Sequence, residues 1–215
     1  MDVGMAFMAN SFKEFGILQM SAIHEMANIG LGHAMRALSD LTQHNFNMSV
    51  PSVDSVPVTT LSSLVGGEET LCVATFMPID GDIEGYTAFV FPWESAQSIW
   101  HMLLGAAPDS PESLEEIHQS AMMEIGNILN SSFLNALADM TDLRLHATPP
   151  FVGVEMVSSL IGSVVSEAEE NDTMLLAVET SIYDEESETK GFFLCIPTRV
   201  GLELLFERLG IAEAA

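Results

Sequence analysis

Two alternating periods of hydrophobic and polar positions divide this 215-residue chain into segments that predict helices and strands. Apolar residues that recur every three or four positions predict helices, whereas short β-branched or aromatic runs between glycine, proline and aspartate predict strands. The predicted helices cover residues 17–41, 93–105, 114–140 and 198–209. The predicted strands lie within residues 48–58, 69–78, 85–92, 143–157, 173–180 and 191–197.

Prolines, glycines and acidic residues add detail to these elements. Residues 48–58 contain two prolines, and because proline cannot donate a ladder hydrogen bond, we expect an edge strand or a bulged one. The Asp-Gly-Asp sequence at 80–82 predicts a hairpin turn. The acidic stretches 166–172 and 184–190 predict solvent-facing loops. Residues 1–16 show little pattern and form a short lead-in.

A set of polar residues occurs twice, 99 positions apart, in the two long predicted helices. In each copy a proline follows the asparagine after 22 intervening residues. Positions i, i+4 and i+7 of a helix fall close to one line, so each helix would present a hydroxyl, a carboxylate and a carboxamide along one stripe. The first copy consists of Ser21, Glu25, Asn28 and Pro51, and the second consists of Ser120, Glu124, Asn127 and Pro150.

The repetition extends beyond these residues, to about 17–105 and 116–210. Phe-Val-Phe-Pro at 89–92 matches Leu-Cys-Ile-Pro at 194–197 with an offset of 105, so the second half has gained about six residues. Helices and hairpins with little βαβ alternation predict an α+β fold. We expect the two copies to share one largely antiparallel sheet with long helices and pseudo-twofold symmetry. Residues 1–215 would then form a single domain.

The charge of the chain is strongly acidic, with 31 Asp and Glu against 6 Lys and Arg and a formal net charge of −25. Such a surface repels nucleic-acid phosphates and anionic membranes, whereas it suits a protein partner with basic groups. No apolar run reaches the 18 residues of a membrane span. The N-terminus carries Asp2 and no basic segment, which argues against a signal peptide. We therefore expect a cytoplasmic protein.

The cysteines and histidines give little indication of a metal site or of nucleophilic catalysis. Cys72 and Cys195 lie in separate apolar runs, so we expect buried free thiols in a reducing compartment. The six histidines form no cluster with ligand spacing. His24 and His33 match no histidine in the second copy, and no histidine is fixed beside Ser21. A Ser-His-Asp triad is therefore weakly supported.

The repeated carboxamide offers a different chemistry. An asparagine side chain can hold a water molecule by hydrogen bonds and aim it at a phosphoryl group, so that it contributes positioning and no proton transfer. The neighbouring glutamate could pair with a lysine on a partner protein. A single Glu-x-x-Asn on a helix has little specificity and is more often part of a solvated face. The duplication strengthens the case, although it shows common origin more firmly than function.

The spacing Asp/Ser-x3-Glu-x2-Asn-x22-Pro resembles the signature of the CheC family of response-regulator phosphatases, which includes CheX and FliY. The surrounding sequence Asn28-Ile-Gly-Leu-Gly-His-Ala resembles the first repeat of that family, and Ile125-Gly-Asn127 resembles the second. The resemblance covers nearly the whole chain and includes its duplicated layout, and CheC is the best match. Ala27 departs from the family pattern, which commonly has glycine before this asparagine.

This resemblance implies a CheC-like fold and a hydrolase that removes the aspartyl phosphate from a CheY-type response regulator in chemotaxis. Asn28 and Asn127 would orient the attacking water. Glu25 and Glu124 would contact a lysine of the regulator. The matching serines would support the site, whereas the matching prolines are better explained by strand geometry. Mg²⁺ would belong to the regulator, so the chain is expected to carry no metal or cofactor of its own.

Two other functions remain open at this point. The chain could be a non-catalytic adaptor that binds a receiver domain or the receptor deamidase CheD, which some CheC proteins bind. The retained Glu-Asn pairs argue against this, because binding alone does not require the carboxamide. It could also be a flagellar-switch component, since that machinery shares the fold. We expect no C-terminal switch module after the second closing helix, and this argues against that role.

Overall fold

The computed structural model describes residues 17–42, 45, 47–167, 174–183 and 188–211. The predicted lead-in, residues 1–16, lies outside this part of the chain, as do most of the two predicted acidic loops. The α-helices are α1 (Ile17–Thr42), α2 (Leu61–Val65), α3 (Trp93–Leu104), α4 (Glu116–Thr141), α5 (Val157–Glu167) and α6 (Arg199–Arg208). The strands are β1 (Asn47–Pro57), β2 (Leu71–Gly81), β3 (Gly85–Pro92), β4 (Leu145–Ala147), β5 (Phe151–Met156), β6 (Met174–Tyr183) and β7 (Glu188–Pro197).

The strands form one sheet in the order β1-β6-β7-β3-β2-β4, and β5 also pairs with β2. Every strand pair in the described residues is antiparallel. The order reads symmetrically outward from the β7–β3 pair. Strand β1 of the first half pairs with β6 of the second, while β4 and β5 of the second half pair with β2 of the first. The predicted α+β class, antiparallel sheet and pseudo-twofold layout are confirmed.

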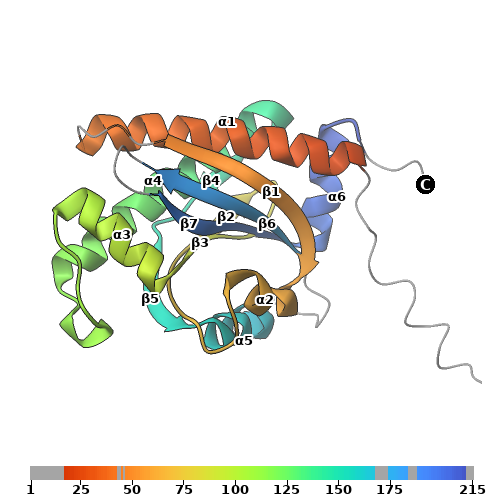
Figure 1. Cartoon of the computed structure of the whole chain (residues 1–215). Helices are drawn as coiled ribbons and strands as arrows, with labels where there is room; N and C mark the ends of the chain where they lie inside the picture. Colours follow the sequence, from red (N-terminus) through yellow and green to blue (C-terminus); the bar gives the residue numbers. More distant parts are fainter. Residues whose placement is uncertain (1–16, 43–44, 46, 168–173, 184–187, 212–215) are drawn as a thin grey trace, which may run out of the picture.

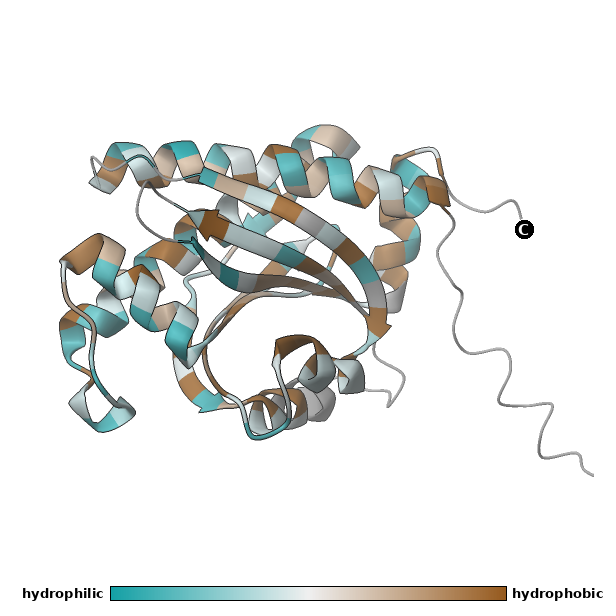
Figure 2. Ribbon diagram, viewed as in Figure 1, coloured by the Kyte–Doolittle hydropathy of each residue, from teal (hydrophilic) through white to brown (hydrophobic). Residues whose placement is uncertain are grey.

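Helices cover both faces of this sheet (Figure 1). The two long helices α1 and α4 lie against one face, and α2 and α5 lie together against the other. Buried side chains accordingly gather in two clusters, one on each side. Because β2 and β7 are covered on both faces, their buried residues run continuously and do not alternate. Figure 2 shows hydrophobic residues along these strands, between the helical layers.

Close contact between α1 and α4 depends on Gly30. A Cβ at this position would lie 2.8 Å from Phe133 Cα and 3.3 Å from Ala136 Cβ, so a larger residue would push the helices apart. Such close backbone approach is one reason to place glycine within a helix despite its low propensity. This packing sets the distance between the two long helices, which carry the two polar stripes.

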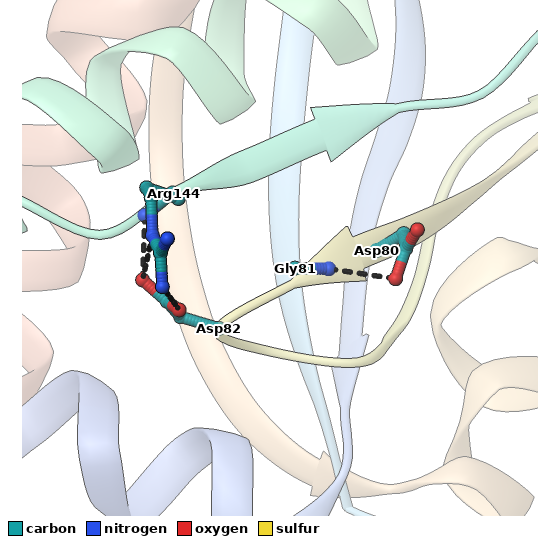
Figure 3. Close-up of polar contacts among 4 residues, drawn as sticks. All are labelled: Asp80, Gly81, Asp82 and Arg144. Carbon is teal, nitrogen blue, oxygen red and sulfur yellow. Dashed lines mark hydrogen bonds and ion pairs between the residues drawn. The ribbon is translucent and has the colours of Figure 1, made fainter.

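The far end of α4 is tied to the turn after β2 (Figure 3). The Arg144 backbone N–H donates to Asp82 Oδ2 at 2.9 Å, and its guanidinium Nη2 donates to Asp82 Oδ1 at 3.0 Å. These contacts hold the pKa of the Asp82 carboxyl below its usual value. Gly81, at φ 124°, lies so close to the Arg144 carbonyl that a Cβ would overlap it. The turn after β2 therefore packs closely against the segment after α4 and is hydrogen-bonded to it.

The predicted free cysteines are confirmed as buried. Cys72 lies on β2 and Cys195 on β7, both without a disulfide. Burial raises the pKa of each thiol to about 12, so neither forms an appreciable thiolate at neutral pH. Both thiols pack as small apolar groups in the sheet.

Some predicted boundaries are wrong. Residues 58–65 form a 3₁₀ turn followed by α2, and residues 157–167 form α5, where the sequence pattern predicted no helix. Helix α5 begins directly after β5 with no glycine or proline between them, whereas the 3₁₀ turn before α2 follows Pro57, which ends β1. Strand β7 begins at Glu188, inside the predicted loop 184–190. Helix α5 extends to Glu167, inside the predicted loop 166–172.

Candidate functional site

The first polar stripe lies on the outer face of α1, and we call it site one: Ser21, Glu25 and Asn28. All three side chains are exposed. The opposite face of the same turns is buried, with Ile23, Met26 and Ala27 packed into the core. The helical spacing therefore separates the two sets of residues as the sequence predicted, and the amide of Asn28 is accessible to a partner.

The second stripe lies on α4, and we call it site two: Ser120, Glu124 and Asn127. These side chains are also exposed, and Met122, Ile125 and Gly126 are buried behind them. The start of α4 is held in place by the indole Nε1 of buried Trp100, which donates to the His118 carbonyl at 2.8 Å. A rigid helix start, two residues before Ser120, fixes where the stripe begins.

Pro51 lies in an outer strand and Pro150 directly precedes one, and these strands pack beside α1 and α4. Pro51 is in β1, where the ladder with β6 shifts register between Ser49 and Ser52. Pro150 lies between β4 and β5 and is half-buried. Strand β1 is thus both an edge strand and a bulged one, as its prolines predicted.

A hydrogen-bond chain connects site one to this bulge. His24 Nε2 lies 3.2 Å from the Val50 carbonyl oxygen, and Asn28 Nδ2 lies 3.0 Å from His24 Nδ1. His24 is half-buried and sits four residues before Asn28, one turn along α1. The sequence pattern gave only weak support for His24 in a catalytic triad and predicted no other role for it. Its i, i+4 spacing to Asn28 was the available signal.

Site two has different neighbours around its asparagine. Met123 occupies the position of His24, and Ser131 occupies the position of Gly32. The Ser131 hydroxyl lies 3.4 Å from Asn127 Oδ1, on the C-terminal side of the amide. The two carboxamides are therefore contacted from opposite directions along their helices.

The residue before each asparagine also differs. Ala27 is fully buried, and α1 accommodates its methyl group in the core. Gly126 has no such space, because a Cβ there would lie 2.5 Å from Thr75 Cβ and Oγ1 on β2. The departure at Ala27 from the family pattern thus leaves Asn28 exposed and α1 continuous.

Both stripes are surface features rather than pocket linings. A surface hollow of about 420 Å³ lies between α1 and the start of β1, and another of about 550 Å³ lies between α2, α3 and the β6–β7 hairpin. None of the site residues lines either hollow. Small-molecule sites are normally concave. An exposed helix edge is better suited to enter a pocket on another protein.

The described residues contain no group of three or more His, Cys, Asp or Glu side chains placed to hold a metal ion. In the same part of the chain, no helix combines the length and apolar composition that crossing a membrane requires.

The two stripes also coincide with the parts of the chain that resemble known proteins. The CheC-like family model matches residues 18–54 and 117–154, the two segments that carry the stripes and their prolines. A Bacillus subtilis protein named CheY-P phosphatase CheC is 32% identical over 196 residues, covering 89% of this chain and 94% of that protein.

Solved structures show the same fold. Thermotoga maritima FliY matches with a TM-score of 0.76 at 18% identity, covering 94% of this chain and all of that one. The CheX–CheY complex with BeF3 and Mg²⁺ from Borrelia burgdorferi matches with a TM-score of 0.50 at 15% identity, covering 80% of this chain and 98% of the matched one. The Bacillus subtilis relative matches along most of its length, and the family model matches at both stripes. This chain therefore belongs to the CheC family.

Proposed function

We propose that this chain dephosphorylates the aspartyl phosphate of a CheY-type response regulator in chemotaxis signalling. The observation that carries the proposal is the exposed Ser-Glu-Asn stripe, present once on α1 and once on α4. The name of the Bacillus subtilis relative, CheY-P phosphatase CheC, supports the reaction. The Borrelia burgdorferi structure, a CheX in complex with CheY, BeF3 and Mg²⁺, supports the type of partner.

In this mechanism the asparagine contributes positioning. The carboxamide of Asn28 or Asn127 would enter the receiver's active site and hold a water in line with phosphorus. The water oxygen forms a bond to phosphorus while the bond from phosphorus to the aspartyl oxygen breaks. The products are inorganic phosphate and a free aspartate carboxylate on the receiver, and the protons of the water pass to phosphate and solvent. Mg²⁺ would be held by the receiver.

The glutamates would fix the register of the complex. Glu25 and Glu124 each lie one turn before the asparagine on the same exposed line. A receiver lysine could form a charge-assisted hydrogen bond with either carboxylate. Ser21 and Ser120, one turn further toward the N-terminus, would support this contact, and Pro51 and Pro150 would shape the adjoining strands.

The surface around the stripes also suits a protein partner. Leu18 and Ile117 occupy equivalent positions, three residues before each serine, and their side chains are 74% and 56% exposed. Each polar stripe thus begins with an exposed apolar residue on the same helical face. Together with the strongly acidic composition, this favours a partner surface that combines apolar and basic groups.

We further propose that residues 1–215 act as a single domain made of the repeats 17–105 and 116–210, in the cytoplasm. The exchange of outer strands between the halves supports this, because β1 completes the strands of the second half and β5 those of the first. Neither half would keep its sheet intact without the other.

A second candidate function is a non-catalytic one, as an adaptor for a receiver or for CheD, or as a flagellar-switch component. The fold match to Thermotoga maritima FliY, and the weaker one to a FliM middle domain with a TM-score of 0.64, favours the switch alternative. Binding without any effect on the phosphate lifetime of a receiver would support these alternatives over the phosphatase.

The test is the decay of phosphate on a purified CheY-type receiver with and without this protein. The wild-type protein should shorten the lifetime, and the double variant Asn28→Ala, Asn127→Ala should not, although it folds and binds the receiver. Binding to the BeF3-activated receiver separates loss of catalysis from loss of association. A double variant that is as active as the wild type would rule out the carboxamide mechanism.

A further inference from the structure

His24 has a defined hydrogen-bonding state because its two ring nitrogens face different kinds of partner. The Val50 carbonyl oxygen, 3.2 Å from Nε2, can only accept a hydrogen bond. Nε2 must therefore carry the proton. In the neutral imidazole Nδ1 is then a bare acceptor, and the group 3.0 Å from it must donate. That group is the amide nitrogen of Asn28.

This chain of partners fixes the rotation of the Asn28 carboxamide. Its NH₂ group points toward His24, and its carbonyl oxygen points away from the imidazole. The side chain is exposed, so that oxygen is open to solvent or to a docked partner. A carbonyl oxygen accepts a hydrogen bond from a water molecule and thereby turns an oxygen lone pair of the water away from itself. A water held in this way is oriented for attack on an electrophile beyond it.

The origin of this orientation is the strand, not the helix. Val50 lies in the irregularity of the β1–β6 ladder that contains Pro51. A backbone carbonyl is fixed by the strand that carries it and cannot change from acceptor to donor. The orientation therefore passes from the β1 bulge through the imidazole to the amide of Asn28.

Site two lacks this device. Met123, at the position of His24, is 42% exposed and has only a weakly accepting thioether. The Ser131 hydroxyl near Asn127 can rotate, and it can either donate to the amide oxygen or accept from the amide nitrogen. Both rotations of the Asn127 carboxamide are thus compatible with its neighbour, so its orientation is not fixed.

We propose that His24 is a positioning residue of site one, which sets the Asn28 carboxamide with its oxygen outward for the water that attacks the receiver phosphate. The proposal deepens the proposed function of this site and rests on it for the identity of the reaction. Loss of the acceptor at Nδ1 would allow the amide to rotate, so the rate of the chemical step falls while binding of the receiver is retained.

The kinetic test uses the Asn127→Ala background, in which only site one can act. Asn at position 24 places an amide oxygen close to the position of Nδ1, whereas Gln at 24 places a donor close to the position of Nε2. Met at 24 copies site two. His24→Met and His24→Gln should lower the maximal rate of receiver dephosphorylation about five-fold with KM unchanged, the effect expected for one hydrogen bond. His24→Asn should stay within about two-fold of its parent.

Two results would overturn the assignment. One is an unchanged rate for His24→Met. The other is a rate that is kept by His24→Gln and lost by His24→Asn, since that pattern means His24 only anchors α1 to β1. In the Asn28→Ala background His24→Met should leave the site-two rate unchanged, which controls for effects on the whole fold.

A spectroscopic measurement keeps the inference separate from the proposed function. In ¹⁵N-labelled wild-type protein, we expect the Nε2–H tautomer of His24 and a coupling across the hydrogen bond between Asn28 Nδ2 and His24 Nδ1. The opposite tautomer, or the absence of that coupling, contradicts the positioning role whatever the enzyme activity. If the coupling is detected but the protein has no effect on receiver phosphate, the hydrogen-bond geometry of His24 and Asn28 is supported and the proposed phosphatase function is contradicted.

Discussion

Site one and site two present the same three side chains on equivalent turns of α1 and α4, yet their surroundings differ at each compared position. An imidazole fixed by a strand carbonyl contacts Asn28, whereas a rotatable hydroxyl contacts Asn127. A buried alanine lies behind the first asparagine and a glycine behind the second. Helical spacing thus determines which groups each stripe exposes, and the residues around it determine how firmly they are held.

The largest difference between the sites should appear when a methyl group is added behind the asparagine of site two. We expect Gly126→Ala to lower the free energy of unfolding by about 1–3 kcal/mol, because its Cβ would lie 2.5 Å from buried Thr75 on β2. Urea denaturation measures this change.

The matched control is Gly32→Ala on α1, where a Cβ would meet no atom within 4 Å. Alanine is the better helix former, so this variant should be stabilised by up to about 1 kcal/mol. If the two substitutions changed the free energy of unfolding equally, the close contact between α4 and β2 would not be what excludes a side chain at position 126.

A smaller effect is expected from removing the charge of either glutamate. Glu25→Gln in the Asn127→Ala background, and Glu124→Gln in the Asn28→Ala background, should each weaken receiver binding at the one active site. The KM for receiver dephosphorylation should rise about two- to five-fold, as expected for an exposed ion pair. The loss should shrink as salt concentration rises. The KM measured at two ionic strengths follows this loss, and a KM that responds to neither substitution would contradict the lysine contact.

A still smaller change is expected from Ser131→Ala. Its hydroxyl contact with Asn127 is long, at 3.4 Å, and does not select one amide rotation. The dephosphorylation rate of site two should therefore change by less than about two-fold, measured in the Asn28→Ala background. A five-fold loss would mean that Ser131 serves site two as His24 is proposed to serve site one.

The smallest expected effect concerns the ion pair beyond the C-terminal end of α4. The lowered pKa of Asp82 means that its contribution to stability is present above the unfolded-state value, about 3.9, and is lost as pH falls through the lower folded-state value. Asp82→Asn should therefore unfold slightly earlier than the wild type at pH 7, and the gap should close in acid. Thermal unfolding across this range measures the gap; a gap that widens in acid would have the wrong sign.

Much of this arrangement could be predicted from sequence. The periods of 2 and 3.6 gave the long helices and most strands, and the repeated spacing identified Glu25, Asn28 and their counterparts as exposed neighbours. Helix α5 was missed because no breaker separates it from β5. The segment after β1 follows Pro57, but α2 has only 5 residues, too few to show a helical period.

The contacts around the asparagines were beyond the sequence pattern. The His24–Val50 hydrogen bond joins residues 26 apart and depends on where the β1 bulge turns a carbonyl. The close approach of Gly126 to Thr75 depends on how α4 lies against β2. Both are products of tertiary packing, which local periodicity does not specify.

The central claim is that two separate carboxamides each direct a water onto a receiver phosphate. It is tested most directly by the decay rate of receiver phosphate with Asn28→Ala, Asn127→Ala and the double variant, at one protein concentration. Each single variant should keep part of the acceleration, the two parts should sum to the wild-type value, and the double variant should leave only the receiver's own decay. Full acceleration in the double variant would contradict the account.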